Sequence, residues 1–403
     1  MTCVTVRSRC AGASKLRTFS LAELVLLAWV ARSGRLLRMI IGIASADFAR
    51  RSITADGGEH WGGPGWVRLG QWIPLWSQHH EVHAGELWNR GDHLEIEVDL
   101  PDGSRQFVAP DVVYLQRKMD DVAAVLRRAR ASGQLIVQDI DDWFWGLDPR
   151  NKAFPLVAPK LADYAAGLAE SDVIVASTRY LAERLAERFG GKRIVVIPNY
   201  VDVDRFTPTE HAGDPDDPRP VVGWAGATEF RSGDLAELRG VLGQVRGEVR
   251  FRHAGHAEDA PRFAAEVGLP DDAVELVGRA GVAEFPTLLD FQVGLVPLRS
   301  TPFNEAKSDL KGLEYAAAGI PFVASPTSPY RELHERWGDC VRIARKPVDW
   351  VKGIRHFADP AVRQDAAEEL RKQVLERHLT EGLHHHLDLF GALDHRSSGG
   401  GAA

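Results

Sequence analysis

The sequence predicts an α/β protein made of two doubly wound domains that face each other across a central cleft. Short apolar runs alternate with stretches of helical periodicity along most of the chain, and this alternation is typical of a mostly parallel sheet covered by helices. A segment rich in Pro, Asp and Gly, 207–220, interrupts the alternation near the middle. The length agrees with a division there, because 403 residues are too many for one ordinary domain and suit two.

Composition and charge exclude several classes of protein. Hydrophobic residues make up 44% of the chain and charged residues 26%, as in a soluble globular protein with a sizeable core. The formal net charge of -7 argues against a dedicated nucleic-acid binder, which needs a basic face, so we expect no nucleic-acid partner. Cys3, Cys10 and Cys340 are too few and too scattered for a disulfide framework. We therefore expect a reducing compartment, the cytoplasm.

Residues 1–38 differ from the rest of the chain, and we expect them to lie outside the fold. They carry seven basic residues against a single acid, Glu23. Their apolar run, 21–31, is well short of the roughly 20 residues that span a bilayer, and no clear cleavage site follows it. The alternative is a helix that lies at the membrane surface, which would give the protein a peripheral membrane contact.

The N-terminal domain is expected to occupy residues 39–206. Its predicted strands are 39–45, 111–117, 134–142, 171–178 and 193–199. The first, MIIGIAS, is a continuous apolar run that ends in small residues, as a buried parallel strand should. Helical stretches at 119–133 and 179–191 separate the later strands, and Gly133 is a suitable C-cap for the first of them.

The alternation restarts after the 207–220 linker and defines a C-terminal domain, 221–359. The predicted strands are 221–227, 249–255, 273–278, 293–298 and 321–325, with helices at 234–245 and 308–318. A helical segment, 360–392, then returns to the first domain, and a Ser/Gly-rich tail, 393–403, is expected to be disordered. Ligands of open α/β sheets lie outside the carboxyl ends of the strands, so the site should lie in the loops that follow strands.

The stretch FNEAKSDLKGLEYAAAGIPFVAS, 303–325, combines three charged residues with a small-residue turn. Lys311 and Glu314 fall three residues apart on one face of the predicted helix, and Lys307 lies at its start. Two lysines could neutralise a diphosphate, and a nearby carboxylate could accept hydrogen bonds from the two hydroxyls of a ribose. A surface helix with a solvated Lys–Glu pair explains the same spacing, so the residues alone leave both interpretations open.

The turn GWAGATEFRSGDL, 223–235, is a second candidate for phosphate binding. Gly223 and Gly226 allow close approach of the backbone to a ligand, and the next helix offers amides to an anion. Arg231 adds a cation beside them. The spacing is not the G-x-G-x-x-G fingerprint of dinucleotide binding, and a plain tight turn explains the glycines equally well.

Three stretches together resemble the GT-B retaining glycosyltransferases of family 4: VIVASTRYLAERLAERFGGKRIVVIPNYVDVDRFTP, VVGWAGA and LKGLEYAAAGIPFVAS. The pattern K-x-x-E-Y-x-A-x-G-I-P-x-V-A-S is the most specific and V-I-P-N-x-V-D the next; the resemblance extends over residues 39–390. It implies two Rossmann-like domains, a nucleotide diphosphate sugar as donor in the C-terminal domain, and transfer to an acceptor hydroxyl with retention of configuration. The acceptor, bound by the N-terminal domain, stays open among a glycan, a lipid, a protein and a small molecule.

The resemblance also implies roles for residues of the C-terminal domain. Glu314 matches the second glutamate of the family's E-x7-E motif, which holds the donor ribose. Lys311 matches the lysine three residues before it, and Arg231 looks like the first of the basic residues at the diphosphate. Gly226 belongs to the same donor-binding turn.

Two positions depart from the family pattern. Eight residues before Glu314 the family has a glutamate that touches the donor sugar, whereas this chain has Ala306. The family's lysine at the start of the first helix of the C-terminal domain is also replaced, with Asp234 near that place. Lys307 is expected to supply the missing charge at the diphosphate.

The N-terminal half offers two further candidates. Gly57 and Gly58 belong to a glycine-rich loop, where the resemblance places a loop for the acceptor and the donor phosphates; a flexible surface loop is the alternative. Asp139 and Asp141 have the D-x-D spacing that binds a divalent metal and a diphosphate in the other large glycosyltransferase fold, GT-A. In a GT-B enzyme the same strand end faces the cleft, and either aspartate would touch the sugar or the acceptor without a metal.

We therefore expect a metal-independent GT-B transferase with no cofactor besides its nucleotide sugar donor. The expected catalytic residues are Asp139, Asp141, Arg231 and Lys307, and the expected donor-binding residues are Gly57, Gly58, Gly226, Arg231, Lys307, Lys311 and Glu314. Two alternatives remain: a nucleotide-binding GT-B module without catalysis, of which Ala306 is the signature, and a metal-dependent GT-A transferase that uses Asp139 and Asp141.

Overall fold

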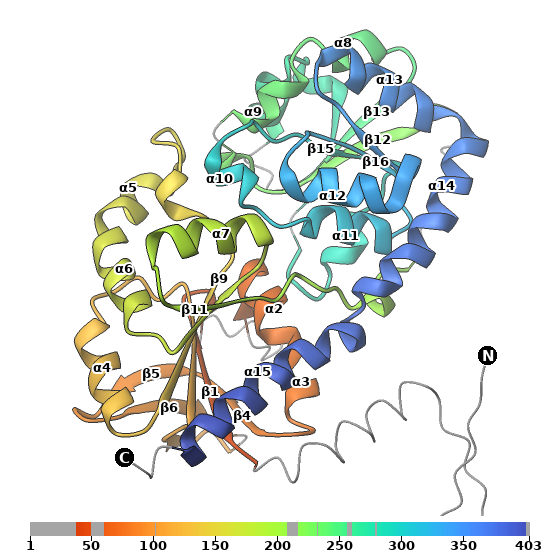
Figure 1. Cartoon of the computed structure of the whole chain (residues 1–403). Helices are drawn as coiled ribbons and strands as arrows, with labels where there is room; N and C mark the ends of the chain where they lie inside the picture. The colour runs from red at the N-terminus through yellow and green to blue at the C-terminus, as the bar shows by residue number, and fades with distance from the viewer. Residues whose placement is uncertain are drawn as a thin grey trace, which may run out of the picture.

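The computed structural model describes residues 38–49, 60–100, 102–207, 217–231, 233–255, 260–278 and 280–399. Gly57 and Gly58, residues 1–37 with the expected membrane-surface helix, and most of the expected linker lie outside these residues. The chain forms two α/β domains, one above the other in Figure 1, and its C-terminal helices run along both.

The first domain contains a six-stranded parallel sheet with the order β11-β10-β9-β8-β1-β4. Its strands are β1 (Ile40–Ser45), β4 (Glu81–Ala84), β8 (Val112–Gln116), β9 (Leu135–Ile140), β10 (Val173–Ala176) and β11 (Arg193–Val196). The central strands are buried over nearly their whole length, which explains their continuous apolar sequences. The order reverses beside β1, so a switch point lies between β1 and β8.

The second domain contains another six-stranded parallel sheet, with the order β14-β13-β12-β15-β16-β17. Its strands are β12 (Val221–Ala225), β13 (Arg250–Ala254), β14 (Val274–Val277), β15 (Val293–Val296), β16 (Phe322–Ala324) and β17 (Val341–Ile343). This is the 3-2-1-4-5-6 order of a doubly wound dinucleotide-type sheet, with its switch point between β12 and β15. The predicted fold class is confirmed in both halves.

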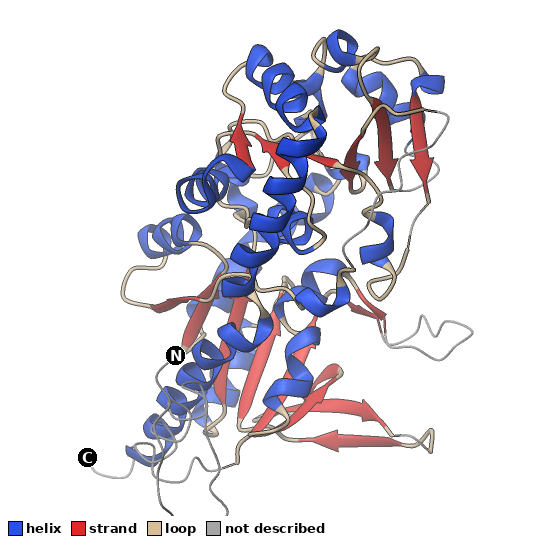
Figure 2. Cartoon of the chain, turned by 90° about the vertical axis from the view of Figure 1, so that its right-hand side faces the viewer, coloured by secondary structure: helices blue, strands red, loops and turns tan. Residues whose placement is uncertain are grey.

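Helices cover both sheets and connect the strands. In the first domain they are α2 (Gly63–Arg68), α3 (Ile73–Trp76), α4 (Ala123–Ala131), α5 (Phe154–Val157), α6 (Leu161–Ala169) and α7 (Arg179–Arg188). In the second domain they are α8 (Leu242–Val245), α9 (Ala260–Val267), α10 (Pro302–Glu305), α11 (Leu310–Ala317), α12 (Ser328–Trp337) and α13 (Pro347–Ala358). Then α14 (Pro360–Gln373) and α15 (Leu379–Gly399) pass from the second domain to the first (Figure 1 and Figure 2).

Three features differ from the sequence prediction. An antiparallel sheet of β5 (Glu86–Asn89), β6 (Leu94–Asp99) and β7 (Arg105–Val108) extends from the first domain and was not predicted. The helix expected at 234–245 is a short 3-10 turn followed by α8, because Gly240 between them has a φ of +72°. The tail expected to be disordered from 393 is helical as far as Gly399, since Leu393 is fully buried against the first domain.

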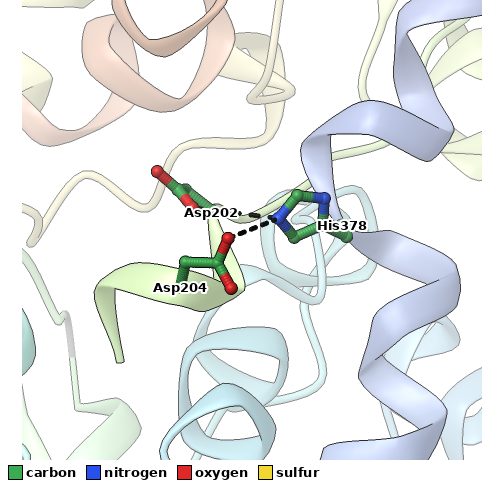
Figure 3. Close-up of side chains that lie close together, drawn as sticks. All are labelled: Asp202, Asp204 and His378. Atoms are coloured by element: carbon green, nitrogen blue, oxygen red, sulfur yellow. Dashed lines mark ion pairs between the residues drawn. The ribbon is translucent and has the colours of Figure 1, made fainter. Parts of the chain in front are cut away.

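Two segments connect the domains, and they meet at a hinge. Val201, which follows β11, pairs with His378 just before α15 in a parallel bridge. The Nε2 atom of His378 lies 3.8 Å from Oδ1 of Asp202 and 3.8 Å from Oδ2 of Asp204 (Figure 3). Because one histidine faces two carboxylates from the other segment, the ion pairs add an electrostatic contact to the backbone bridge.

The interface between α15 and the first domain contains two buried histidines. The His386 ring lies 4.3 Å from the Trp72 ring, and His80 packs edge-on against Phe390 at 5.3 Å. The ring nitrogens of both histidines have no hydrogen-bond partner among the described residues. Burial lowers the pKa of His80 to about 4 and that of His386 well below its ordinary value. Both rings are therefore neutral in the folded protein at neutral pH.

We predict that these histidines make the fold acid-sensitive. In the unfolded chain His80 titrates near 6.5, so the unfolded state binds more protons as the pH falls from 6.5 to 4. His80 alone should lower the free energy of unfolding by about 2 kcal/mol between pH 7.5 and 5. Denaturant titrations of His80→Leu should show a smaller loss over this range than the wild type. His384→Leu, on the exposed face of α15, is the control, and equal pH dependence in all three proteins would contradict the prediction.

Candidate active site

A cavity of about 260 Å³ lies between the two domains, where the carboxyl ends of both sheets converge. Arg117 follows β8, Asp141 and Asp142 follow β9, and Arg231 follows β12. The cavity is lined by Pro64, Val67, Arg68, Arg117, Asp141, Asp142, Asn199, Arg231, Val296, Leu298, Lys307, Ser308, Leu310, Lys311, Glu314 and Tyr330. It therefore occupies the position at which doubly wound sheets bind their ligands.

The wall formed by the C-terminal domain is basic. Lys311, on α11, donates a hydrogen bond from Nζ to the carbonyl of Ala225 at the end of β12. Burial, with the nearby charge of Arg231, lowers the pKa of Lys311, and burial raises the pKa of Glu314. The Nε atom of Arg231 is buried without a hydrogen-bond partner among the described residues. This wall thus holds donor groups whose hydrogen-bonding capacity is not used up by the protein.

Gly226 shapes this wall without lining the cavity. Its φ of +149° is open to glycine alone, and a Cβ atom there would lie 3.0 Å from the Trp224 ring. Its amide donates to the carbonyl of Ala254 at 2.9 Å, which fixes the turn that leads to Arg231. Gly226 is thus a special backbone position, but the group that lines the cavity is the side chain of Arg231, five residues later.

The wall formed by the N-terminal domain carries charges of both signs and is organised around Arg117. Its guanidinium binds Asp141 through two hydrogen bonds of 2.9 and 2.7 Å. It also contacts Asp142 at 3.1 Å and Asp47 at 3.4 Å. Arg117 has a φ of +54°, which is uncommon outside glycine and turns the chain sharply after β8. Sequence reasoning missed Arg117 and Asp142, because nothing local distinguishes them from other loop charges.

One ion pair crosses the cavity from domain to domain. The Nζ atom of Lys307 lies 3.1 Å from Oδ1 of Asp142. Burial alone would raise the pKa of Asp142, but the charges of Lys307 and Arg117 outweigh it and lower that pKa. Asp142 is therefore a carboxylate at neutral pH.

The segment before Lys307 docks into the N-terminal domain. Ala306 is fully buried among the side chains of a core cluster that contains Trp143, Phe144 and Tyr164. Its carbonyl accepts a hydrogen bond from Oγ1 of Thr178 at 3.0 Å. An apolar contact and a hydrogen bond thus hold the two domains together beside the cavity.

Asp139 lies behind the cavity and does not line it. Its side chain is 0% exposed, and Arg68 at the end of α2 binds both carboxylate oxygens, at 2.9 and 2.7 Å. Asp141 faces the cavity and is held by a different arginine, Arg117. The two carboxylates of the D-x-D pattern therefore do not form one set of metal ligands. The expectation that Asp139 touches a sugar or acceptor does not fit this buried position.

Among the described residues, one group of three side chains could hold a metal ion: Asp202, Asp204 and His378. It lies at the hinge (Figure 3) and not in the cavity. The Asp204 side chain is 93% exposed, and the Nδ1 atom of His378 accepts the Thr380 amide at 3.3 Å, which leaves a proton for Nε2 in the neutral ring. An Nε2–H group that faces two carboxylates accounts for the arrangement without a metal ion.

A second cavity, of about 370 Å³, adjoins the first and is more apolar. Trp66, Phe206 and Phe285 contribute to it. Pro64, Val67, Leu310 and Glu314 line both cavities, so Glu314 lies at their boundary. The two cavities therefore share one wall, and the second is the more apolar while the first is highly charged.

Comparison with known proteins identifies the fold. Sucrose-phosphate synthase from Thermosynechococcus elongatus superposes with a TM-score of 0.66 at 15% identity and covers 89% of this chain and 100% of its own. The catalytic domain of starch synthase IV from Arabidopsis thaliana, bound to ADP and acarbose, gives 0.60 at 11% identity, with coverages of 89% and 100%. The UDP-forming trehalose-phosphate synthase from Burkholderia vietnamiensis gives 0.58 at 13% identity, with the same coverages.

The chain has the GT-B fold. The GT-A alternative is therefore wrong, because two doubly wound sheets face one cavity. No protein-family model matches the sequence, and no curated protein matches it. Among the described residues, no helix has the length and apolarity needed to cross a membrane.

We predict that Asp139→Asn lowers the free energy of unfolding, whatever its effect on a reaction. The substitution removes the charge that pairs with the buried Arg68, and breaking such a pair costs about 3–5 kcal/mol. Urea unfolding should show this loss. Asp120→Asn, which removes an exposed partner of Lys160, should shift the free energy of unfolding by less than about 1 kcal/mol. Unchanged stability of Asp139→Asn would contradict a structural role.

Proposed function

We propose that the chain is a glycosyltransferase that moves a sugar from a nucleotide diphosphate donor to an acceptor hydroxyl with retention of configuration. The observation that carries this proposal is the position of Glu314 between an apolar and a basic cavity. A nucleotide sugar has a matching order of parts: a flat base whose ring faces stack on apolar surface, a ribose with two hydroxyls, and then a charged diphosphate. The GT-B fold, which the chain shares with sugar transferases, supports the same reading.

The base and the ribose fit the boundary of the second cavity. Trp66 and Phe285 provide apolar surface for a flat ring. The Glu314 carboxylate, one helical turn from Lys311 on α11, can accept hydrogen bonds from both ribose hydroxyls. This is the role that the resemblance to family 4 implies for Glu314.

The diphosphate fits the basic wall of the first cavity. Lys311 and Lys307 can act as point charges on the phosphates, and the Arg231 guanidinium lines the same wall. As the bond to the sugar breaks, negative charge accumulates on the departing phosphate, and fixed cations stabilise it there. The diphosphate charge also favours the protonated form of Lys311, whose pKa is lowered in the empty protein.

Retention follows from attack on the face that the diphosphate leaves. A covalent intermediate would need a carboxylate available as a nucleophile, and both Asp141 and Asp142 are bound by Arg117. Such pairing stabilises the anion and weakens it as a nucleophile. The acceptor, a glycan, a lipid, a protein or a small molecule, then approaches from the N-terminal wall.

The test is a panel of nucleotide sugars in which binding and turnover are both measured in the presence of EDTA. Binding with slow hydrolysis or transfer to a saccharide mixture is the expected result, because protein side chains supply the cations. Binding without any turnover would favour the alternative of a non-catalytic nucleotide-binding module. Turnover that is lost in EDTA and restored by Mn²⁺ would contradict metal independence.

Substitutions on α11 test which side chain contacts the ribose of the donor and which contacts its diphosphate. Glu314→Gln removes the charge that strengthens hydrogen bonds to the ribose, about 1.5–3 kcal/mol, so donor affinity should fall roughly ten- to a hundredfold. Lys311→Ala should weaken nucleoside diphosphate binding much more than nucleoside binding. Isothermal titration measures both effects.

A matched control is available on α14. Glu369 and Lys372 form an exposed pair with the same three-residue spacing, and Glu369→Gln and Lys372→Ala should leave every affinity unchanged. If the α11 variants behave like the α14 variants, Lys311 and Glu314 do not contact the donor and the proposed donor site is wrong.

A further inference from the structure

We propose that Asp142, together with Lys307 from the opposite domain, recognises the hydroxyl groups of the donor sugar. This inference rests on the proposed function and adds a specificity-determining residue to it. Recognition of the sugar then depends on both domains at once, because one member of the pair comes from each.

The two cavities leave one place for the sugar. With the base in the second cavity, Glu314 marks the ribose, and Lys311 with Arg231 marks the diphosphate. The sugar is joined to the far phosphate, so it must lie beyond these cations in the first cavity. Lys307, which the proposed function also places at the phosphates, borders this space through its pair with Asp142. The other charged lining residues there are Arg68, Arg117, Asp141 and Asp142.

Asp142 has the chemistry needed to bind hydroxyls. Its Oδ1 is bound by Lys307 at 3.1 Å and its Oδ2 by Arg117 at 3.1 Å. Each carboxylate oxygen has two acceptor sites, so each can accept one further hydrogen bond. Two cations hold the group in one orientation, which lets it discriminate between positions of a sugar hydroxyl. The side chain is 15% exposed, enough to contact a ligand in the cavity.

The burial of Ala306 explains why a residue at another position contacts the donor sugar. The resemblance places a glutamate for the donor sugar at position 306, but here that position is fully buried in the core of the N-terminal domain. The next residue, Lys307, lines the cavity and forms an ion pair there with Asp142. A carboxylate contact with the sugar is thus supplied from across the cavity.

Contacts on either side of the pair fix its geometry. Thr178 donates to the Ala306 carbonyl at 3.0 Å, and Nδ2 of Asn199 donates to Oγ of Ser308 at 2.8 Å. Both contacts join the domains, one residue away from Lys307 in each direction. The distance between Lys307 and Asp142 is therefore set by the arrangement of the domains.

The experiment compares UDP, UDP-glucose, UDP-galactose, ADP and ADP-glucose with the wild type, Asp142→Asn and Asp120→Asn. Asp142→Asn should bind UDP and ADP within about twofold of the wild type. Its kcat/KM for the preferred nucleotide sugar should fall about ten- to a hundredfold, and the preference between the glucose and galactose donors should fall toward one. Asp120→Asn, at an exposed pair away from the cavity, should match the wild type throughout.

The preference between epimeric donors separates sugar recognition from a structural role. If Asp142→Asn is slower but keeps the wild-type preference, the carboxylate only supports the domain arrangement and the inference is overturned. If Asp142→Asn fails to fold, Lys307→Met is measured in its place, with loss of preference supporting the inference and an unchanged preference overturning it. A wild type that binds no nucleotide sugar of the wider panel overturns the proposed function itself, which is a separate result.

Discussion

The structure depends on a buried hydrogen-bond network centred on Asn199, at the point where the chain leaves the first domain. Its Oδ1 accepts from Arg68 at 2.9 Å, and its Nδ2 donates to Ser308 of the second domain at 2.8 Å. Its carbonyl accepts from Arg377, which also binds Asp309 at 2.9 Å. One asparagine therefore ties together both domains and the returning C-terminal segment. The network gives a physical reason for the V-I-P-N pattern in the sequence, because the asparagine amide offers an acceptor and a donor on separate atoms.

The fold could be predicted because its signals are local. Buried parallel strands such as β8 and β10 require continuous apolar runs, and these are visible without any knowledge of contacts. The antiparallel sheet was missed although LEIEVD, 94–99, alternates strictly between apolar and acidic residues, the pattern of a half-exposed strand. The break in the helix at 234–245 depends on one glycine with a positive φ, and a sequence does not show which glycines adopt it.

The candidate site was predictable only in part. Lys311, Glu314 and Arg231 follow strands or face the sheet edge within one domain, and all three line the cavity. Asp139 was placed with Asp141 because their D-x-D spacing is that of metal-binding aspartates in GT-A enzymes. However, β9 ends at Ile140, so the alternation stops between the two aspartates. Arg117 and Asp142 acquire their roles from partners far along the chain, and spacing carries no information about such partners.

The burial of Ala306 limits the residues that position 306 can accept. A glutamate there would place a carboxylate among aromatic rings, and a buried charge is strongly unfavourable unless it gains a partner. The surrounding core would have to shrink or supply such a partner before that residue became tolerable. A single substitution to glutamate is therefore opposed by packing, whatever sugar the chain uses.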